Sequence, residues 1–391
     1  MKYLLVAFII LTNLSVRAVS HWWLLSSQVF SVGSKIGCNN IAGLVKSQRA
    51  ICSRYPKLML KVGVGASNAL KECQRQFAYR RWNCSVSDGT SPILGKLMSK
   101  ANRESAFFHA VSSAGVVHEV TRSCSRGELS DECRCDRSMR GFYGDGFIWD
   151  TCNDNIEFGM RFSSAFLDAR EVVNDARALL NKHNNEAGRQ AVQKNMEMPC
   201  KCHGMSGSCT TKYCRRSLPP LEKVGEYLHK KYRSAVLVTL DQSSNKLVNL
   251  DKIVSKFGKN DLVYLEQSPN YCRRDLSQGI VGTAGRECNK SSLSENSCDI
   301  LCCGHGYKSK MVTERVNCNC KFIWCCKVAC EKCIRVVEKN YCKSPEENEN
   351  ILSQKNSREG KKWKRRNRKN KRRQRKDRKK RRKPRTHKNK S

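Results

Sequence analysis

The residues with the clearest chemical potential lie in one short run, Cys200-Lys201-Cys202-His203-Gly204-Met205-Ser206-Gly207-Ser208-Cys209, which Cys214 closes. The spacings fit two nested disulfides, one between Cys200 and Cys214 and one between Cys202 and Cys209. These cross-links would hold residues 203–208 as an exposed loop tip that presents the hydroxyl of Ser206 between two glycines. A modifying enzyme needs access to the backbone on both sides of its target. The run therefore predicts that Ser206 is a modification site.

Two other chemistries are open to this run. Four cysteines and His203 could ligate zinc, although thiols oxidise in a secreted protein. The stretch 204–208 also resembles the nucleophile elbow of hydrolases, but Ser208 stands where glycine is expected and no strand precedes it. An acid to orient His203 is not evident in the sequence. We therefore predict no catalytic residue, no metal and no cofactor, and turnover of an ester substrate would contradict this.

The cysteines and the N-terminus together indicate secretion. Twelve of the 24 cysteines lie within 38–214 and twelve within 272–342, which predicts two separately cross-linked regions. Residues 1–20 read as a signal peptide, with Lys2, an apolar run and small residues before the cleavage point. The alternative, a membrane anchor, is disfavoured because the apolar run is shorter than the ~20 residues that a spanning helix needs. Disulfides persist in the extracellular space that this route leads to.

The C-terminal tail carries much of the net charge of +39. Residues 361–391 contain 21 Lys or Arg, one acid (Asp377) and Trp363 as the only aromatic residue. Such a segment cannot bury a core, so we expect a disordered polycation. Outside the cell its partners would be sulfated glycosaminoglycans or anionic membranes rather than nucleic acid. The alternatives are a merely solvated tail, or one removed by proteases at the dibasic run 379–383.

Helical elements must position the hairpin. Apolar residues spaced three and four apart predict amphipathic helices at 103–122 and 155–181, whose apolar faces should pack together. A third helix is predicted at 57–80, although Gly63 and Gly65 weaken its start. The N-terminal region is therefore mostly helical.

Beyond Cys200 the pattern favours strands. Runs rich in β-branched residues predict short strands at 235–240, 262–266, 310–316 and 321–324. The predicted fold is α+β and disulfide-rich, with a helical N-terminal domain that carries the cross-linked hairpin (thumb) and a small cysteine-dense β-hairpin C-terminal domain (finger). The predicted boundaries are a signal peptide at 1–20, the helical domain at 21–258 with the hairpin at 200–214, the cysteine-rich domain at 259–345 and the basic tail at 346–391.

Five runs together resemble the Wnt family of secreted morphogens. They are CKCHGMSGSC at 200–209, RRWNCS at 80–85, RESAFFHAVSSAGV at 103–116, NDLVYLEQSPNYC at 260–272 and CNCKFIWCCKVACEKC at 318–333. The likeness covers about residues 30–345 and is nearest to the type-two Wnts. The tail after Cys342 departs from the family, whose chains usually end shortly after their last cysteine.

The resemblance implies specific partners. Ser206 aligns with the serine that the acyltransferase Porcupine esterifies with a monounsaturated fatty chain, and Met205 would lie beside that chain. The lipidated thumb would bind the cysteine-rich domain of Frizzled receptors, and the carrier Wntless would hand the ligand on. A co-receptor of the low-density-lipoprotein-receptor-related type would meet another face. The product would be a developmental signal in the extracellular matrix, held at membranes by its lipid and bound to heparan sulfate by its tail.

The resemblance also implies a second receptor contact at the finger tip, made by Phe322, Ile323, Trp324, Cys325 and Cys326. The adjacency of the two cysteines suggests a vicinal disulfide and a rigid turn. Exposed aromatic side chains on such a turn lose little entropy on docking. The alternative is that Trp324 fills a small core.

Disulfides and glycans follow from the family pattern. Asn83 and Asn289 stand in sequons that match positions glycosylated in the family. The implied disulfides join Cys73 to Cys84, Cys124 to Cys133, Cys135 to Cys152, Cys272 to Cys303, Cys288 to Cys298, Cys302 to Cys342, Cys318 to Cys333 and Cys320 to Cys330, which leaves Cys38 with Cys52. The competing reading of the whole chain is a non-lipidated cysteine-rich factor or antagonist bound to heparan sulfate.

Overall fold

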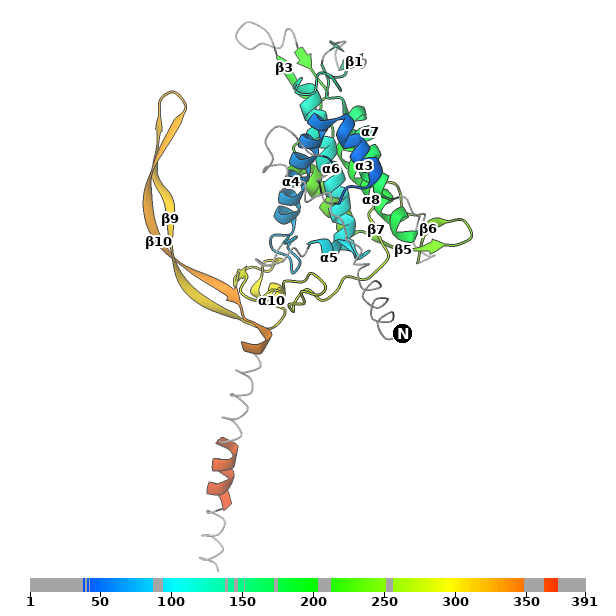
Figure 1. Cartoon of the computed structure of the whole chain (residues 1–391). Coiled ribbons are helices and arrows are strands. Elements are labelled where there is room, and N and C mark those ends of the chain that lie inside the picture. The colour runs from blue at the N-terminus through cyan, green and yellow to red at the C-terminus, as the bar shows by residue number, and fades with distance from the viewer. Residues whose placement is uncertain are drawn as a thin grey trace, which may run out of the picture. The chain divides into compact units, whose positions relative to one another are not determined.

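The computed structural model (Figure 1) describes residues 38, 41, 43–86, 94–137, 140–143, 147–150, 152–171, 175–202, 212–250, 256–347 and 362–371. The chain divides into two compact units, Met1–Val281 (unit 1) and Gly282–Ser391 (unit 2). The predicted signal peptide lies outside the described residues. So does the greater part of the basic tail.

Unit 1 is built around helix α6 (Arg103–Ser125), nearly all of whose residues are buried. Its neighbours are α4 (Pro56–Gln76), α7 (Ile156–Leu167), α8 (Ala176–Lys194) and α9 (Leu221–Arg233), which pack around it as Figure 1 shows. A helix surrounded in this way must be apolar or small-sided on every face. The shorter helices α3 (Lys46–Arg54) and α5 (Leu94–Met98) complete the set among the described residues.

Two glycines allow α4 and α6 to approach closely. A Cβ atom on Gly65 would lie 2.6 Å from the carbonyl oxygen of Gly115, and one on Gly115 would lie 2.5 Å from that of Gly65. Helix α4 therefore runs through Gly63 and Gly65 without a break. The expectation that these two glycines weaken the start of the helix is wrong. The close backbone approach that only glycine permits explains why these positions carry no side chain.

The long helix predicted at 155–181 is wrong, because the chain breaks between α7 and α8. A short 3-10 turn, η2 (Asp168–Arg170), follows α7, and α8 begins after Asp175, whose side chain accepts a hydrogen bond from the N–H of Ala178 at 2.7 Å. Aspartate is a preferred residue at such a helix start. The break lets the two helices lie against each other and against α6.

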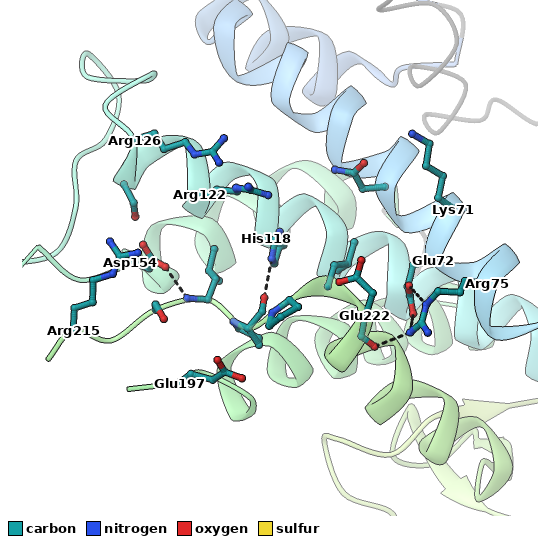
Figure 2. Close-up of a pocket in the computed structure, with 17 residues that line it drawn as sticks. Lys71, Glu72, Arg75, His118, Arg122, Arg126, Asp154, Glu197, Arg215 and Glu222 are labelled. Atoms are coloured by element: carbon teal, nitrogen blue, oxygen red, sulfur yellow. Dashed lines mark hydrogen bonds and ion pairs between the residues drawn. The ribbon is translucent and has the colours of Figure 1, made fainter. Parts of the chain in front are cut away.

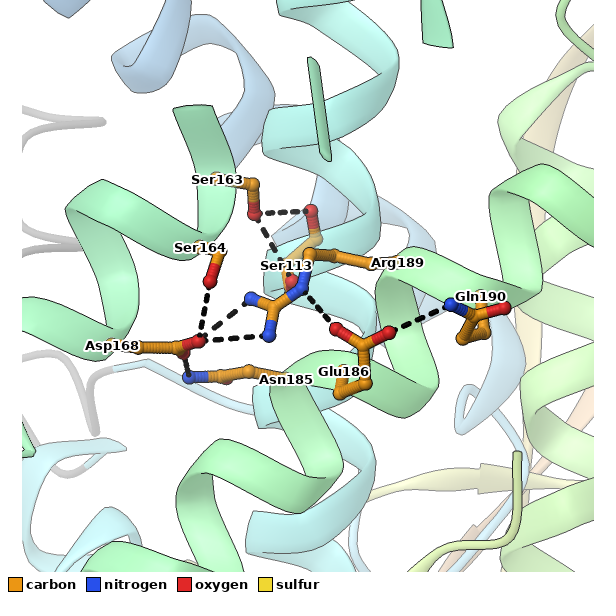
Figure 3. A network of polar contacts seen from close by, with 8 residues as sticks. All are labelled: Ser113, Ser163, Ser164, Asp168, Asn185, Glu186, Arg189 and Gln190. Carbon is orange, nitrogen blue, oxygen red and sulfur yellow. Dashed lines mark hydrogen bonds and ion pairs between the residues drawn. The ribbon is translucent and has the colours of Figure 1, made fainter. Parts of the chain in front are cut away.

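A polar network fastens this break (Figure 3). The carboxylate of Asp168 accepts hydrogen bonds from Ser164, Asn185 and Arg189, the last at 2.8 Å. Arg189 is only 3% exposed, and its Nε also donates to Glu186 at 2.7 Å. A buried guanidinium is tolerated because both carboxylates satisfy it.

Three small sheets complete unit 1. They are the hairpin of β1 (Arg140–Tyr143) with β2 (Phe147–Asp150), the hairpin of β3 (Cys200–Cys202) with β4 (Lys212–Cys214), and the order β6-β5-β7 formed by Lys246–Asn249, Val236–Asp241 and Val263–Tyr264. This compact unit extends to Val281, and the predicted domain boundary at 258 stays a prediction. Leu262, Tyr271 and Ile280 belong to the main core of unit 1, and they draw the chain before Gly282 into it.

Unit 2 is a long two-stranded ribbon on a small base. Strands β9 (Tyr307–Ile323) and β10 (Lys327–Cys342) pair along their whole length, and β8 (Glu287–Cys288) pairs with the base of β10. The two short strands predicted at 310–316 and 321–324 are thus parts of one strand. The core of the base, beside helix α10 (Cys298–Leu301), consists of Leu301 and four cysteines: Cys288, Cys298, Cys302 and Cys342. Sulfur replaces the apolar side chains that a larger domain would bury.

In the tail, residues 362–371 form an exposed helix and not the expected disordered segment. Lysine and arginine are good helix formers, which accounts for a helix whose side chains are all exposed. Within the described ranges, none of the helices combines the length and the apolar character needed to cross a bilayer.

Candidate functional site

The cross-linked hairpin predicted from the sequence is present in unit 1. Strands β3 and β4 are antiparallel, with Cys200 opposite Cys214 and Cys202 opposite Lys212. A disulfide joins Cys200 to Cys214, and Cys202 is also disulfide-bonded. The loop between the strands, with Met205, Ser206 and Cys209, lies outside the described residues. The described strands thus fix where that loop leaves and rejoins unit 1.

The base of the hairpin is tied to Asn153 and Asp154. The buried side chain of Asn153 accepts a hydrogen bond from the N–H of Arg216 at 2.7 Å, and that of Asp154 accepts one from Leu218 at 2.6 Å. The backbone N–H of Asp154 donates to the carbonyl of Arg216 at 2.9 Å. Neither residue was predicted from the sequence, because their partners lie more than 60 residues further along the chain.

His118 on α6 holds the segment that follows the hairpin. Its Nε2 lies 2.9 Å from the carbonyl oxygen of Pro219, and because a carbonyl only accepts, this nitrogen carries the proton. Burial lowers the pKa of His118, so the ring is neutral. The residue after Pro219, Pro220, is the N-cap residue of α9.

The finger tip of unit 2 projects apolar side chains into solvent. Phe322 is 70% exposed, Ile323 50% and Trp324 90%. Trp324 therefore fills no core among the described residues, which excludes the alternative interpretation that it fills a small core. The disulfides between Cys318 and Cys333 and between Cys320 and Cys330 cross-link the ribbon below the tip. The exposed aromatic residues thus stand on a stiffened support.

The predicted vicinal disulfide at the tip is not formed. Cys325 and Cys326 are free and exposed, and their sulfur atoms lie 4.0 Å apart, about twice the ~2.05 Å of a bond. Both residues have positive φ angles, 73° and 81°. The pairing of Ile323 with Lys327 in the ribbon closes the turn. The turn therefore does not depend on a disulfide between Cys325 and Cys326.

Six other disulfides join the cysteines that the family pattern pairs or leaves as the remaining pair. Cys272 and Cys303 are each disulfide-bonded, and their union with each other stays a prediction. The observed pairs beyond those of the hairpin and the tip are Cys38 with Cys52, Cys73 with Cys84, Cys124 with Cys133, Cys135 with Cys152, Cys288 with Cys298 and Cys302 with Cys342.

The described cysteines of the hairpin, Cys200, Cys202 and Cys214, offer no thiolate to zinc because each is disulfide-bonded. Cys200 is consumed by its bond to Cys214. Cys288, Cys298 and Cys302 have sulfur atoms within 4.8 Å of one another, but each is part of a disulfide. Zinc binds the deprotonated thiol, which a disulfide cannot supply.

Both predicted sequons lie in loops. Asn289 is exposed, and its side chain accepts a hydrogen bond from the N–H of Ser291 at 2.9 Å. Asn83 is half-buried and accepts from the hydroxyl of Ser85 at 2.6 Å. Glycosylation at either asparagine stays a prediction.

Comparison with known proteins agrees with these features. The family model described as "wnt family" matches residues 40–343. Human Wnt-2b is 44% identical over 341 residues, which cover 86% of this chain and 86% of that protein, in line with the expected likeness to type-two Wnts. A chain in the solved structure titled "Human WLS in complex with WNT8A" is 40% identical, with a TM-score of 0.56, and the match covers 74% of this chain and 94% of that one.

A further solved structure, a Drosophila WntD N-terminal domain with its linker, is 24% identical with a TM-score of 0.40, and the match covers 54% of this chain and 97% of that one. The family match spans both the hairpin of unit 1 and the ribbon of unit 2. Together with the extent of the identity to Wnt-2b, it settles the classification. The chain belongs to the Wnt family.

Proposed function

We propose that this signalling ligand engages the cysteine-rich domain of Frizzled receptors through two contacts, an acylated Ser206 and the finger tip. Wnt proteins are signalling ligands without enzymatic activity or cofactor. The observation that carries the proposal is the hairpin, closed by the Cys200–Cys214 disulfide and tied at its base to Asn153 and Asp154. A braced hairpin of this kind fixes the two points between which the chain with Ser206 runs.

The lipid would supply most of the adhesion. At ~0.8 kcal/mol for each buried CH₂, a monounsaturated fatty chain contributes on the order of 10 kcal/mol when fully buried. Met205, beside it in sequence, adds a soft apolar contact. The exposed Phe322, Ile323 and Trp324 form the second contact, with the free Cys325 and Cys326 at the turn.

The other partners fit the same scheme. Porcupine would acylate Ser206 and Wntless would carry the lipidated product. A solved relative is titled as a complex of WLS with WNT8A, and this supports the carrier proposal. A single acyl chain binds a membrane only marginally, so a carrier can release the ligand. A co-receptor of the low-density-lipoprotein-receptor-related type and heparan sulfate complete the proposed set, with glycans on Asn83 and Asn289.

The test is the substitution Ser206→Ala, with Ser208→Ala in the same loop as its control. Mass spectrometry of the peptide spanning Cys202 to Cys209 should find the acyl chain in the natural protein and in the control but not in Ser206→Ala. Receptor activation in reporter cells should be lost in Ser206→Ala and kept in the control. Full activity of the unacylated variant would overturn the proposal in favour of a non-lipidated factor bound to heparan sulfate.

A further inference from the structure

Unit 1 contains a hollow of about 820 Å³, whose lining includes none of the residues assigned to the proposed receptor contacts. Its walls come from α4, from the C-terminal half of α6, and from the segment that leads from the hairpin into α9 (Figure 2). This volume is typical of sites for small molecules and far exceeds that of a single ion.

Basic side chains outnumber acidic ones in the lining of the hollow. Five basic residues face it: Lys71, Arg75, Arg122, Arg126 and Arg215. Arg75 pairs with Glu72 at 2.8 Å, and Arg126 lies 3.7 Å from Glu128. Across the described residues, Lys71, Arg122 and Arg215 have no ion pair. Figure 2 shows Lys71 and Arg215 on opposite sides of Arg122.

The acids of the hollow are mostly engaged elsewhere. Glu72 accepts from Arg75 and Gln76, and Asp154 accepts from the N–H of Leu218. Glu197 pairs with Lys223 at 2.8 Å. Glu222 is exposed, and within the described part of the chain its side chain makes no hydrogen bond or ion pair, so it is the lining acid available to set against Lys71, Arg122 and Arg215.

A helix start adds neutral donors to the same wall. Helix α9 has 13 residues, and no side chain caps its N-terminus at Pro220. Leu221 and Glu222, whose N–H groups belong to its first turn, line the hollow. Such N–H groups and the helix dipole favour an anion. The contact between His118 and the carbonyl of Pro219 fixes this turn in place.

From these charges and donors we infer that the hollow binds a small polar molecule carrying more than one sulfate or phosphate ester. Arg122 and Arg215 provide the main charged contacts, because guanidinium groups match the geometry of such oxyanions. Lys71 receives a second ester group on the far side of Arg122. The inference involves neither Ser206, nor the finger tip, nor the tail, so it stands apart from the proposed function.

Arginine footprinting of the full chain tests the site directly. The protein is labelled with p-hydroxyphenylglyoxal with and without a trisulfated heparin disaccharide, and each arginine is followed by mass spectrometry. At a probe concentration about ten times its Kd, Arg122 and Arg215 should react about tenfold more slowly. The exposed Arg49 and Arg161, on α3 and α7, should react at an unchanged rate. Unaltered labelling of Arg122 and Arg215, with protection confined to the tail, overturns the inference.

A pair of matched variants separates the hollow from the tail. Arg122→Gln with Arg215→Gln removes two charges from the hollow, and Arg49→Gln with Arg161→Gln removes two from elsewhere in unit 1. Calorimetric titration with the disaccharide should show the hollow's binding step in the second variant and not in the first. Equal binding by both, at equal melting temperatures, contradicts the site.

The source of the ester is distinguished by a second probe. Inositol 1,4,5-trisphosphate presents the same chemistry as a lipid headgroup. Whichever of the two probes protects Arg122 and Arg215 at the lower concentration identifies the ligand as a sulfated saccharide or a phosphorylated headgroup. Protection by neither probe refutes the inference.

Discussion

At the scale of single residues, exposure is the property that separates function from packing. The side chain of Trp324 is 90% exposed, whereas Phe77 and Phe107 are fully buried in contact with each other. A large aromatic side chain left in water has a cost that only a partner can remove. The finger tip therefore gives a direct prediction.

Trp324→Ala should be secreted normally and bind the Frizzled cysteine-rich domain about 30-fold more weakly, as expected for a hot spot worth about 2 kcal/mol. Ile334→Ala is the control, because Ile334 lies on the same ribbon, away from the tip, and is 70% exposed. Surface plasmon resonance with the isolated receptor domain provides the measurement. Equal losses in both variants would show that the tip has no special role.

His118 gives a prediction for pH. Burial lowers its pKa, so the unfolded chain binds a proton near pH 6.5 that the folded chain does not. The stability of unit 1 should therefore fall as the pH drops below about 6.5. His118→Gln should weaken this dependence in thermal melts between pH 7 and 5. His109 and His183, whose pKa values burial also lowers, account for the slope that remains. Glu119 and Glu171, whose pKa values burial raises, oppose it. Identical slopes would contradict the assignment.

At the scale of elements, the hairpin is only as rigid as its base. Asn153→Ala removes the side-chain acceptor of a part-buried hydrogen bond from the Arg216 N–H, at a cost of about 1 kcal/mol. We expect faster amide hydrogen exchange across residues 212–218. Asn195→Ala, which removes a contact at the end of α8, serves as the control. Exchange that rises uniformly over unit 1 would instead assign Asn153 a general role in stability.

The sequence predicted which helices and strands occur more accurately than it predicted where each begins and ends. Periodicity located α4 and α6, and the nested spacing located the hairpin, because these signals are local. The break at Asp168 was missed because its cause is Arg189, which reaches back from the next helix. Gly65 looked like a weakness because its partner, Gly115, lies on another helix. In each case the deciding contact is distant in sequence.

The candidate site was predictable to a similar degree. The cysteines and the exposed tip residues carry a recognisable pattern, whereas Asn153, Asp154 and His118 act through backbone groups of residues 216–219 and leave no such signal. The vicinal bond between Cys325 and Cys326 was wrong because adjacency alone does not bring two sulfur atoms together. Backbone angles at the turn decide that distance.

At the scale of the whole molecule, charge is concentrated at the C-terminal end. Deletion after Glu359 should lower the salt concentration at which the protein elutes from heparin, because the tail holds a large share of the net charge of +39. A Gly/Ser segment of the same length in place of residues 360–391 separates loss of charge from loss of length. An unchanged elution profile would dismiss the tail as a heparan sulfate contact.

The core of the base of unit 2 consists mainly of cysteines, so the folding of this unit places few requirements on the side chains of the ribbon. Cys288, Cys298, Cys302 and Cys342 enclose Leu301, while most side chains of β9 and β10 face water. Substitutions along the ribbon therefore alter its surface without emptying a core. Under the proposed receptor contact, gene duplicates built on this plan would change their receptor preference through substitutions in the ribbon, while the disulfide-linked base still folds.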